Sequence, residues 1–330
     1  MEELLKIVAD AIRGAIGVQG AAFALAAVGL NLHFGYTGLL NFGHIAFMAV
    51  GAYTMAIVVD NGASIWIAVP CGLGAAVVLG LLLGIPTLRL RADYLAITTI
   101  AVGEIIRISI RSSAFEPVTG GVFGLQGFAN EFFALNPFSP GTYGVWRITF
   151  SERSLWVMTV GWTLVALTTL LVWALMRAPW GRVVKAIRED EDAARSLGKN
   201  VFAFKIQSLC IGGAIGALAG MVLAMEAQAV VPDRYLPQTT FFIWTVMILG
   251  GAGTIKGPIA GSIVFWFIVL ATEGLLRQGI DSGLIPDWLL SSQQVAAVRF
   301  VLVGLLLMAL MIWRPQGIFG KREEVLVGAR

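Results

Sequence analysis

Residues 64–86 read SIWIAVPCGLGAAVVLGLLLGIP, a run of 23 residues without a charged side chain. About 20 apolar residues in a helix cross the hydrocarbon core of a bilayer. Lipid offers no partner to backbone N–H and C=O groups, so a spanning segment of this kind must be helical. The run therefore predicts a transmembrane helix.

Further apolar runs of similar length follow along the chain. They lie at residues 16–32, 42–60, 94–110, 154–177, 206–226, 238–252, 257–276 and 297–313. Only 13% of the 330 residues are charged and 58% are hydrophobic, whereas soluble domains carry about a quarter charged residues. We predict an all-α, polytopic membrane helix bundle of about nine spans that forms one domain over residues 1–330.

Basic residues indicate how the bundle is oriented. They are concentrated at Arg177, Arg182, Lys185, Arg188, Arg195, Lys199 and Lys205, with others at Arg89, Arg91, Lys256, Arg314, Lys321, Arg322 and Arg330. Because loops rich in Lys and Arg stay in the cytoplasm, residues 178–205 and the C-terminus are predicted to be cytoplasmic. The net charge of +3 mostly reflects this bias and gives no support for binding to nucleic acid.

The N-terminal residues alternate apolar and charged side chains at helical spacing. Residues 1–15 therefore predict an amphipathic helix at the membrane interface. They lack the basic, apolar and small-residue regions of a cleaved signal peptide.

Small residues recur every four positions in two of the runs. They are Gly72, Ala76, Gly80 and Gly84 in one run, and Gly212, Gly216 and Gly220 in another. Small residues at this spacing let two helices approach closely inside lipid. We predict that both stripes are packing seams.

The stretch GLNLHFGYTGLLNFGHIAFMAVGAY, residues 29–53, interrupts this apolar pattern with glycines, asparagines and histidines. Asn41 and His44 are three residues apart and share a face if the segment is helical, while Gly35, Gly38 and Gly43 weaken a regular helix. One interpretation is a broken helix that lines a cavity. The other is a short inner loop with His44 hydrogen-bonded at the interface.

A similar arrangement appears in the second half of the chain, in MILGGAGTIKGPIAGSIVF, residues 247–265. An apolar span, a glycine-rich break and a span rich in small residues follow one another. Two such breaks in corresponding places of two halves favour a translocation path between them.

Residues typical of enzyme sites are missing from the pattern. Gly257 follows Lys256 where a phosphate-binding loop needs Ser or Thr, so we do not expect this chain to bind ATP. His33 and His44 are the only histidines and no metal-ligand spacing is present, so no catalytic or metal-binding residue is predicted. Glu104 precedes Arg107 and Arg111 on one helix, which indicates a structural ion pair more than a proton-coupling acid.

The segment APWGRVVKAIREDEDAARSLGKNVFAFK, residues 178–205, is the longest charged one. Pro179 ends the preceding span, and an apolar stripe runs through Val183, Ile187, Ala194 and Leu197. Gly198 is placed as a helix C-terminal cap, and Asn200 as the start of the next helix. The pattern predicts one or two short amphipathic helices that dock to a cytoplasmic partner. A solvated charged loop is the alternative.

Several motifs together carry a family resemblance. GYTGLLNFGHIAFMAVGAY, YLAITTIAVGEIIR, VTGGVFGL, GRVVKAIREDEDAARSLGKN, ILGGAGTIKGPIAG and RPQGIFG occur in this order over nearly the whole chain. As a set they resemble the membrane permease subunit of branched-chain amino acid ABC importers. YLAITT and AIREDEDAARSLG are similar to the M-type partner of the permease pair.

The resemblance implies a set of partners. Such permeases pair with a homologous permease in the bacterial inner (plasma) membrane, receive substrate from a periplasmic binding protein and are driven by two cytoplasmic ATP-binding subunits. ATP and Mg would be bound by those subunits, and no cofactor by this chain. Residues 112–153 would form a periplasmic loop. Relatives that carry urea or short amides are an alternative, and a secondary transporter is a further one.

The resemblance and the pattern together name candidate site residues. DAARSLG is similar to the EAA-x3-G coupling motif, with Asp192 where Glu is usual. The residues expected to couple to the ATPases are Arg182, Ile187, Glu189, Asp190, Glu191, Asp192, Ala193, Ala194, Leu197 and Gly198. The residues expected along the translocation path are Tyr36, Asn41, Gly43, His44, Thr98, Gly250 and Gly251. We expect the two glycine breaks to approach each other.

Overall fold

The computed structural model describes residues 2–88, 92–282, 294–314 and 316–320. Its longer helices are α1 (Glu2–Ile16), α2 (Val18–Asn31), α3 (His44–Asp60), α4 (Ile65–Thr87), α5 (Ala92–Arg111), α8 (Glu152–Arg177), α9 (Pro179–Glu189), α11 (Val201–Ala227), α12 (Pro237–Gly250), α13 (Gly257–Asp281) and α14 (Val295–Trp313). A helix lies at each of the nine predicted spans, which confirms the all-α prediction. Arg89, Arg91, Lys321, Arg322 and Arg330, used above for orientation, lie outside the described residues.

Shorter elements connect these helices. They are the π-helix η1 (Leu32–Tyr36), the 3-10 helices η2 (Ser113–Phe115) and η3 (Pro232–Arg234), the helices α6 (Glu116–Thr119), α7 (Asn130–Ala134) and α10 (Glu191–Ser196), and the strands β1 (Leu125–Gln126), β2 (Thr142–Val145), β3 (Ile148–Ser151) and β4 (Ala229–Val230).

Five helical segments in the described residues are long and apolar enough to cross a membrane: Val18–Tyr36, α4, α8, α11 and α13. Helix α3 has 17 residues and α12 has 14. At about 1.5 Å per residue, α12 extends only about 21 Å, less than the thickness of a hydrocarbon core. Each of these two shorter helices adjoins one of the glycine breaks.

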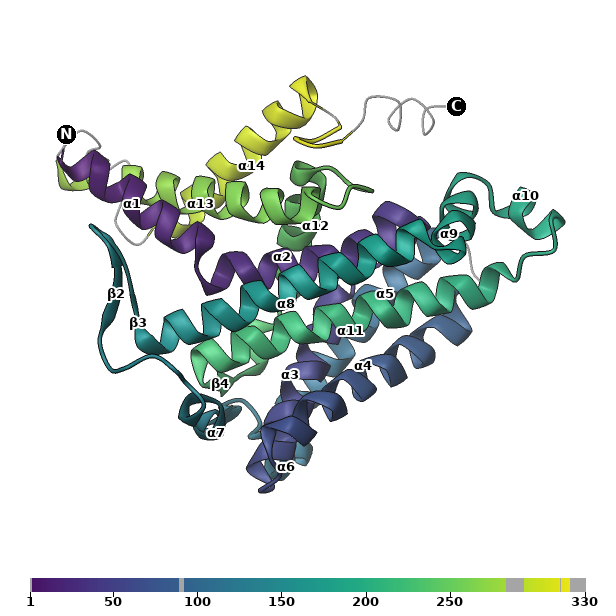
Figure 1. Ribbon diagram of the computed structural model, residues 1–330, viewed down its shortest axis with the longest axis horizontal. Helices are drawn as coiled ribbons and strands as arrows, with labels where there is room; N and C mark the ends of the chain where they lie inside the picture. Colours follow the sequence, from purple (N-terminus) through teal and green to yellow (C-terminus); the bar gives the residue numbers. More distant parts are fainter. Residues whose placement is uncertain (1, 89–91, 283–293, 315, 321–330) are drawn as a thin grey trace.

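Helix α11 lies at the centre of the bundle and packs against α2, α3, α4 and α8 (Figure 1). The small-residue stripes make this packing possible. A Cβ at Gly80 would lie 3.0 Å from the Cys210 sulfur, and one at Gly220 would lie 2.1 Å from the Met48 carbonyl oxygen. Both predicted packing seams are therefore confirmed, one between α4 and α11 and one between α11 and α3.

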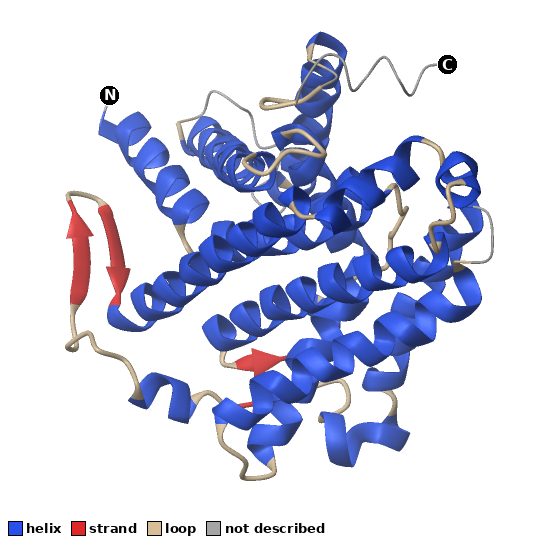
Figure 2. Ribbon diagram, turned by 45° about the vertical axis from the view of Figure 1, so that its right-hand side comes forward, coloured by secondary structure: helices blue, strands red, loops and turns tan. Residues whose placement is uncertain are grey.

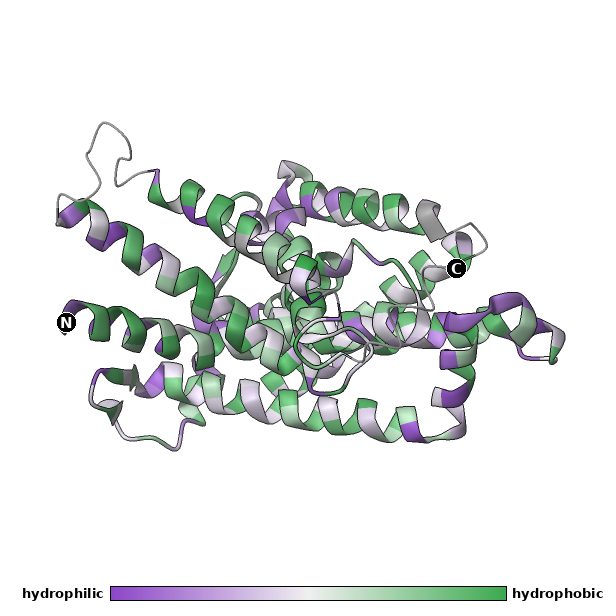
Figure 3. Ribbon diagram, turned by 90° about the horizontal axis from the view of Figure 1, so that it is seen from above, coloured by the Kyte–Doolittle hydropathy of each residue, from purple (hydrophilic) through white to green (hydrophobic). Residues whose placement is uncertain are grey.

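The 26 residues of α8 separate two ends of the molecule. One end, the loop face, carries residues 112–151 with α6, α7 and the hairpin β2–β3, shown as the larger pair of strands in Figure 2. Strand β1 of this face pairs antiparallel with β4, just after α11. The opposite end, the α9–α10 face, is rich in hydrophilic residues (Figure 3).

A carboxylate fastens the loop face to the start of α4. Glu131 of α7 accepts hydrogen bonds from the Ser64 hydroxyl at 2.6 Å and from the Ile65 backbone N–H at 2.7 Å. These two donors favour the ionised carboxylate and lower the pKa of Glu131 below its ordinary value. The contact thus depends on the charge of Glu131.

Helix α1 is amphipathic, as predicted, and packs antiparallel along α13. Glu3 accepts a hydrogen bond from Gln278 at 2.7 Å, and a Cβ at Gly274 would meet Ile7. Leu4, Leu5 and Val8 are exposed on another face. The position of α1 at a membrane interface stays a prediction.

Candidate functional site at the helix breaks

The first break lies between α2 and α3. The regular helix widens into the π-helix η1, becomes irregular after Tyr36, and resumes as α3 at His44. Gly38 adopts a φ of +75°, a left-handed conformation that glycine adopts without steric penalty. His44 is fully buried inside the fold. The break is therefore a non-helical connection over residues 38–43 within the bundle, and the expectation that His44 lies hydrogen-bonded at the interface is wrong.

Polar side chains hold the first break together. The Asn41 amide Nδ2 lies 3.1 Å from His33 Nδ1, and His33 Nε2 lies 3.1 Å from the Leu209 carbonyl oxygen. Because an amide nitrogen donates and a carbonyl accepts, this arrangement places the single proton of a neutral His33 on Nε2. The Asn41 amide oxygen accepts from the Gly43 N–H at 2.9 Å. Asn41 thus joins the break to α11 through His33.

The glycines of α11 provide space for these side chains. A Cβ at Gly212 would lie 2.3 Å from His33 Nε2, and one at Gly216 would lie 2.7 Å from His44 Nε2. The two imidazole rings are 5.4 Å apart, edge to face. The first break therefore packs against the glycine stripe of α11. The spacing of these glycines predicts a packing seam, but it does not show which segment packs there.

Helix α5 contributes Thr99 to the break, a residue that sequence analysis did not single out, and the place of Thr98 along a path stays a prediction. The Phe42 N–H donates to the Thr99 hydroxyl at 3.1 Å, whereas the Thr98 hydroxyl donates to Tyr94 of its own helix at 2.7 Å. Thr99 is fully buried and Thr98 is not. Consecutive residues of a helix point about 100° apart, so Thr98 and Thr99 lie on different faces of α5.

The second break lies between α12 and α13 and contacts the first. Asn31 of α2 donates from its amide to the Thr254 carbonyl at 2.9 Å and accepts from the Gly253 N–H at 2.8 Å. A Cβ at Gly35 would lie 2.5 Å from the Gly253 nitrogen. Asn31, which sequence analysis did not single out, therefore links the two glycine-broken segments directly.

Gly250 and Gly251 end α12 in a tight conformation. Gly251 has a φ of +111°, and a Cβ at Gly250 would lie 1.8 Å from the Gly257 carbonyl oxygen. The Ile318 and Phe319 N–H groups donate to the Leu249 and Gly250 carbonyls at 2.9 and 3.0 Å. The segment after α14 thus satisfies carbonyls that the end of α12 leaves free.

Most of the predicted path residues lie in the interior of this chain. Tyr36, Asn41 and His44 are buried, and Gly43, Gly250 and Gly251 touch backbone of neighbouring segments. They form the framework of the two breaks. Their part in a path stays a prediction.

Helix α9 contacts the first break. The Arg188 guanidinium donates to the Gly35 carbonyl oxygen, and the Lys185 ammonium lies 5.9 Å from the centre of the Tyr36 ring. Val184 and Ile187 are buried on the inner side of α9. Sequence analysis used Lys185 and Arg188 only for orientation and did not predict these contacts, because the partner of Arg188 lies 153 residues away.

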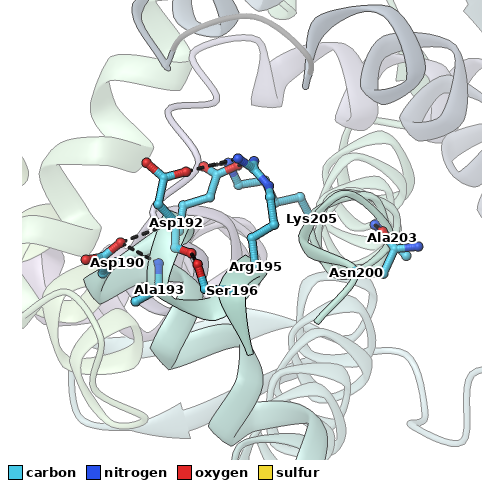
Figure 4. Close-up of polar contacts among 9 residues, drawn as sticks. Asp190, Asp192, Ala193, Arg195, Ser196, Asn200, Ala203 and Lys205 are labelled. Carbon is cyan, nitrogen blue, oxygen red and sulfur yellow. Dashed lines mark hydrogen bonds and ion pairs between the residues drawn. The ribbon is translucent and has the colours of Figure 1, made fainter. Parts of the chain in front are cut away.

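Helix α10 is held by contacts within residues 178–205 (Figure 4). Asp190 caps it by accepting from the Asp192 and Ala193 N–H groups, both at 2.9 Å. Arg195 pairs with Glu191 at 3.0 Å and with Asp192 at 2.9 Å, and Lys205 also pairs with Glu191. Two short helices are therefore present, which confirms the amphipathic-helix prediction over a solvated loop.

The ends of this segment match two predictions and contradict a third. Gly198 has a φ of +75°, as a C-terminal cap requires, and the Asn200 side chain accepts from the Ala203 N–H at 3.1 Å. Ala194 is buried as expected, but Leu197 is 79% exposed. The apolar stripe ends before Leu197 because α10 stops at Ser196 and the chain turns away.

The remaining residues that are predicted to couple to the ATPases lie on the surface of the segment. Arg182 and Glu189 are exposed on α9, and Ala193 is exposed on α10. Together with Leu197 they are available to a partner.

The charged residues of α5 form an ion-pair cluster near the loop face. Glu104 pairs with Arg107, as predicted, with 2.9 Å between Nε and Oε2. Arg111 pairs with Asp233 of η3 at 3.2 Å instead of Glu104. The cluster ties α5 to the loop between α11 and α12.

Comparisons with known proteins show the family to which the chain belongs. The family model described as branched-chain amino acid transport system / permease component matches residues 13–312. The high-affinity branched-chain amino acid transport system permease protein LivM of Escherichia coli is 31% identical over 308 residues, which cover 90% of this chain and 67% of the relative. Its LivH counterpart in Escherichia coli is 26% identical over 92% of this chain and 93% of the relative.

A further relative has lower identity. The probable branched-chain amino acid transport permease protein LivM of Methanocaldococcus jannaschii is 24% identical over 342 residues, which cover 92% of each chain. No solved structure matches the chain.

Proposed function

Because the chain belongs to the branched-chain amino acid transport permease family, we propose that it is the permease subunit of an ATP-driven importer for branched-chain or other hydrophobic amino acids. It is a multi-pass membrane protein of transport, and its family is one of permeases. We place it in the bacterial inner membrane. The M-type assignment rests on its similarity to LivM.

In this proposal the chain works as one half of a permease pair. Relatives named LivM and LivH are both permease proteins of branched-chain amino acid transport systems. A homologous permease is therefore the natural partner. Two cytoplasmic subunits would bind ATP and Mg, and a periplasmic binding protein would deliver substrate to the loop face.

The orientation of the chain follows from its two ends. The α9–α10 face carries the concentration of Lys and Arg that marks a cytoplasmic surface. The loop face, with residues 112–153, then lies in the periplasm.

Coupling is supported above all by the contact between Arg188 and Gly35. An ATPase that moves α9 would pull on the carbonyl of the π-helix through the Arg188 guanidinium. The first break would transmit this motion through Asn31 to Gly253 and Thr254 of the second break. The π-helix and the two glycine breaks are the deformable parts of otherwise continuous helices.

The path would run along the surface that these breaks support beside the partner permease. Asn41 and His44 would shape it from behind, since they are buried here. Tyr36, Gly43, Thr98, Gly250 and Gly251 keep their proposed place near it. Walls built from small and weakly polar groups suit a permease that must let an amino acid pass without retaining it.

Co-purification and transport test the proposal together. The tagged chain, expressed with its partner permease, should retain two ATPase subunits in detergent. The reconstituted complex should then take up leucine only with ATP and the binding protein. Leucine uptake driven by an ion gradient without ATP would establish a secondary transporter, and ATP-dependent uptake of urea but not leucine would establish an amide permease.

A further inference from the structure

A cavity of about 300 Å³ lies between α2, α3, α11, α12 and α13, toward the loop face. Its volume is at the lower end of the range for small-molecule sites. It is separate from the predicted path residues, none of which lines it. The cavity has an apolar interior and a polar side, which together indicate the chemistry of a ligand.

Aromatic and aliphatic side chains form the interior. Phe23 packs edge to face on Trp266 with 4.9 Å between ring centres, and Met48, Leu223 and Phe242 complete the wall. Walls of this composition favour an aliphatic side chain, because each buried methylene contributes about 0.8 kcal/mol. A strongly hydrophilic side chain would lose its hydration there without replacement.

Arg234 supplies a positive charge at the polar side of the cavity. Its neighbour Asp233 pairs with Arg107 and Arg111. Among the described residues Arg234 takes part in no ion pair. No described Asp or Glu lines the cavity, where the other polar residues are Gln19, Tyr235 and Thr239. An exposed guanidinium that pairs with no described carboxylate is suited to bind one from a ligand.

The cavity adjoins the first break. Ile45, on its wall, directly follows His44, and the Ile45 N–H donates to the Thr240 hydroxyl at 3.1 Å. Thr240 is the residue after Thr239 of the lining. An occupant therefore lies beside the joint between α3 and α12, on the loop-face side of the break.

We propose that this cavity is an entry site for an aliphatic amino acid, whose carboxylate binds Arg234 and whose side chain enters the apolar interior. The inference rests on the proposed function, because the loop face must be periplasmic for substrate to arrive there. Among the described lining residues, the polar side chains that could meet the ammonium group are the neutral ones of Gln19, Tyr235 and Thr239. Binding is consequently weak, and basic amino acids are disfavoured by Arg234.

Protection of a cysteine tests the site. Gln19→Cys, in a Cys71→Ser background, places a thiol on the lining of the cavity, and Ser139→Cys is the matched control on the exposed loop face. The purified permease–ATPase complex is labelled with a water-soluble maleimide without binding protein. Leucine and valine should slow labelling at Gln19→Cys but not at Ser139→Cys, and lysine should slow neither.

The charge is tested in the same assay. Adding Arg234→Gln should raise the leucine concentration for half-protection roughly two- to fivefold, the range of an exposed ion pair. Arg234→Lys should stay within about twofold, since it keeps the charge. Protection that depends on added anionic lipid rather than leucine would overturn the proposal in favour of a lipid headgroup.

Two failures are distinguishable. If wild-type complex imports leucine with ATP but leucine never protects Gln19→Cys, the entry site is wrong and the permease function stands. If wild-type complex imports no leucine at all, the proposed function fails first.

Discussion

At the scale of single residues, the two breaks depend on side chains that no linear pattern places together. Gly43 and Gly103 both lie in predicted spans. Gly43 nevertheless touches the backbone of α5, whereas the space around Gly103 has room for a Cβ. A Cβ at Gly43 would lie 2.0 Å from the Thr99 carbonyl oxygen, and one at Gly103 would lie 3.8 Å from its nearest atom. The contacts therefore require a glycine at position 43 but not at position 103.

Gly43→Ala should destabilise the chain, and Gly103→Ala should not. A methyl group at Gly43 must displace backbone, at a free-energy penalty of about 1–3 kcal/mol. At Gly103 the methyl group makes ordinary contacts, and a change within about 0.5 kcal/mol is expected. Thermal unfolding of both variants in detergent measures the difference. Equal midpoints would mean that the first break yields more easily than its backbone contacts indicate.

At the scale of elements, the α9–α10 pair is a small unit with its own caps and ion pairs. Asp190 begins α10, Gly198 ends it, and Asn200 begins α11. These caps could be predicted because Asp, Gly and Asn mark helix boundaries through local backbone geometry. The contact between Arg188 and Gly35 could not, because it joins elements far apart in the chain.

Gly198→Val should uncouple the ATPases, and Gly198→Asn should not. No atom lies within 4 Å of a Cβ at Gly198, so only its φ of +75° matters. A valine at this position carries a free-energy penalty of roughly 1 kcal/mol or more in the left-handed backbone conformation, whereas asparagine tolerates that conformation. Substrate-stimulated ATP hydrolysis by the reconstituted complex is the measurement. Wild-type hydrolysis and uptake with valine would show that this turn is not needed for coupling.

The contact between Glu131 and the start of α4 should weaken in acid. The pKa of Glu131 is lower in the folded protein than its ordinary value of 4.5. The hydrogen bonds that the carboxylate accepts therefore stabilise the fold fully above pH 4.5, and this stabilisation is lost as the pH falls through the folded pKa. Glu131→Gln should therefore speed hydrogen exchange of the Ile65 amide relative to wild type at pH 7. The difference should disappear below the folded pKa, and a difference that persists there would exclude the carboxylate as its cause.

At the scale of the whole molecule, the positions of the nine helices follow from apolar runs alone. The bilayer imposes this regularity, because every spanning backbone must satisfy its own hydrogen bonds. The glycine breaks were also visible as interruptions. The contacts within them were harder to predict: Asn31 and Thr99 lie in apolar runs and His33 directly follows one, and only tertiary packing shows which partners they meet.

Labelling from the two sides of the membrane should distinguish the two faces. A cysteine at Ser139 on the loop face should react with an impermeant reagent from outside, and Asp192→Cys on α10 only from inside. Intact cells and inverted vesicles carrying the Cys71→Ser background provide the comparison. Reaction of Asp192→Cys in intact cells would reverse the proposed orientation.

The ion pairs of α10 have a consequence for how a partner recognises it. Glu191 and Asp192 are already neutralised by Arg195 and Lys205, while Leu197 presents an uncovered apolar side chain. Association through such a surface gains little from long-range attraction, which ions in solution would screen over about 8–10 Å. For the contacts of α10 itself, Leu197→Ser should thus reduce the affinity for the ATPases more than a rise in ionic strength does.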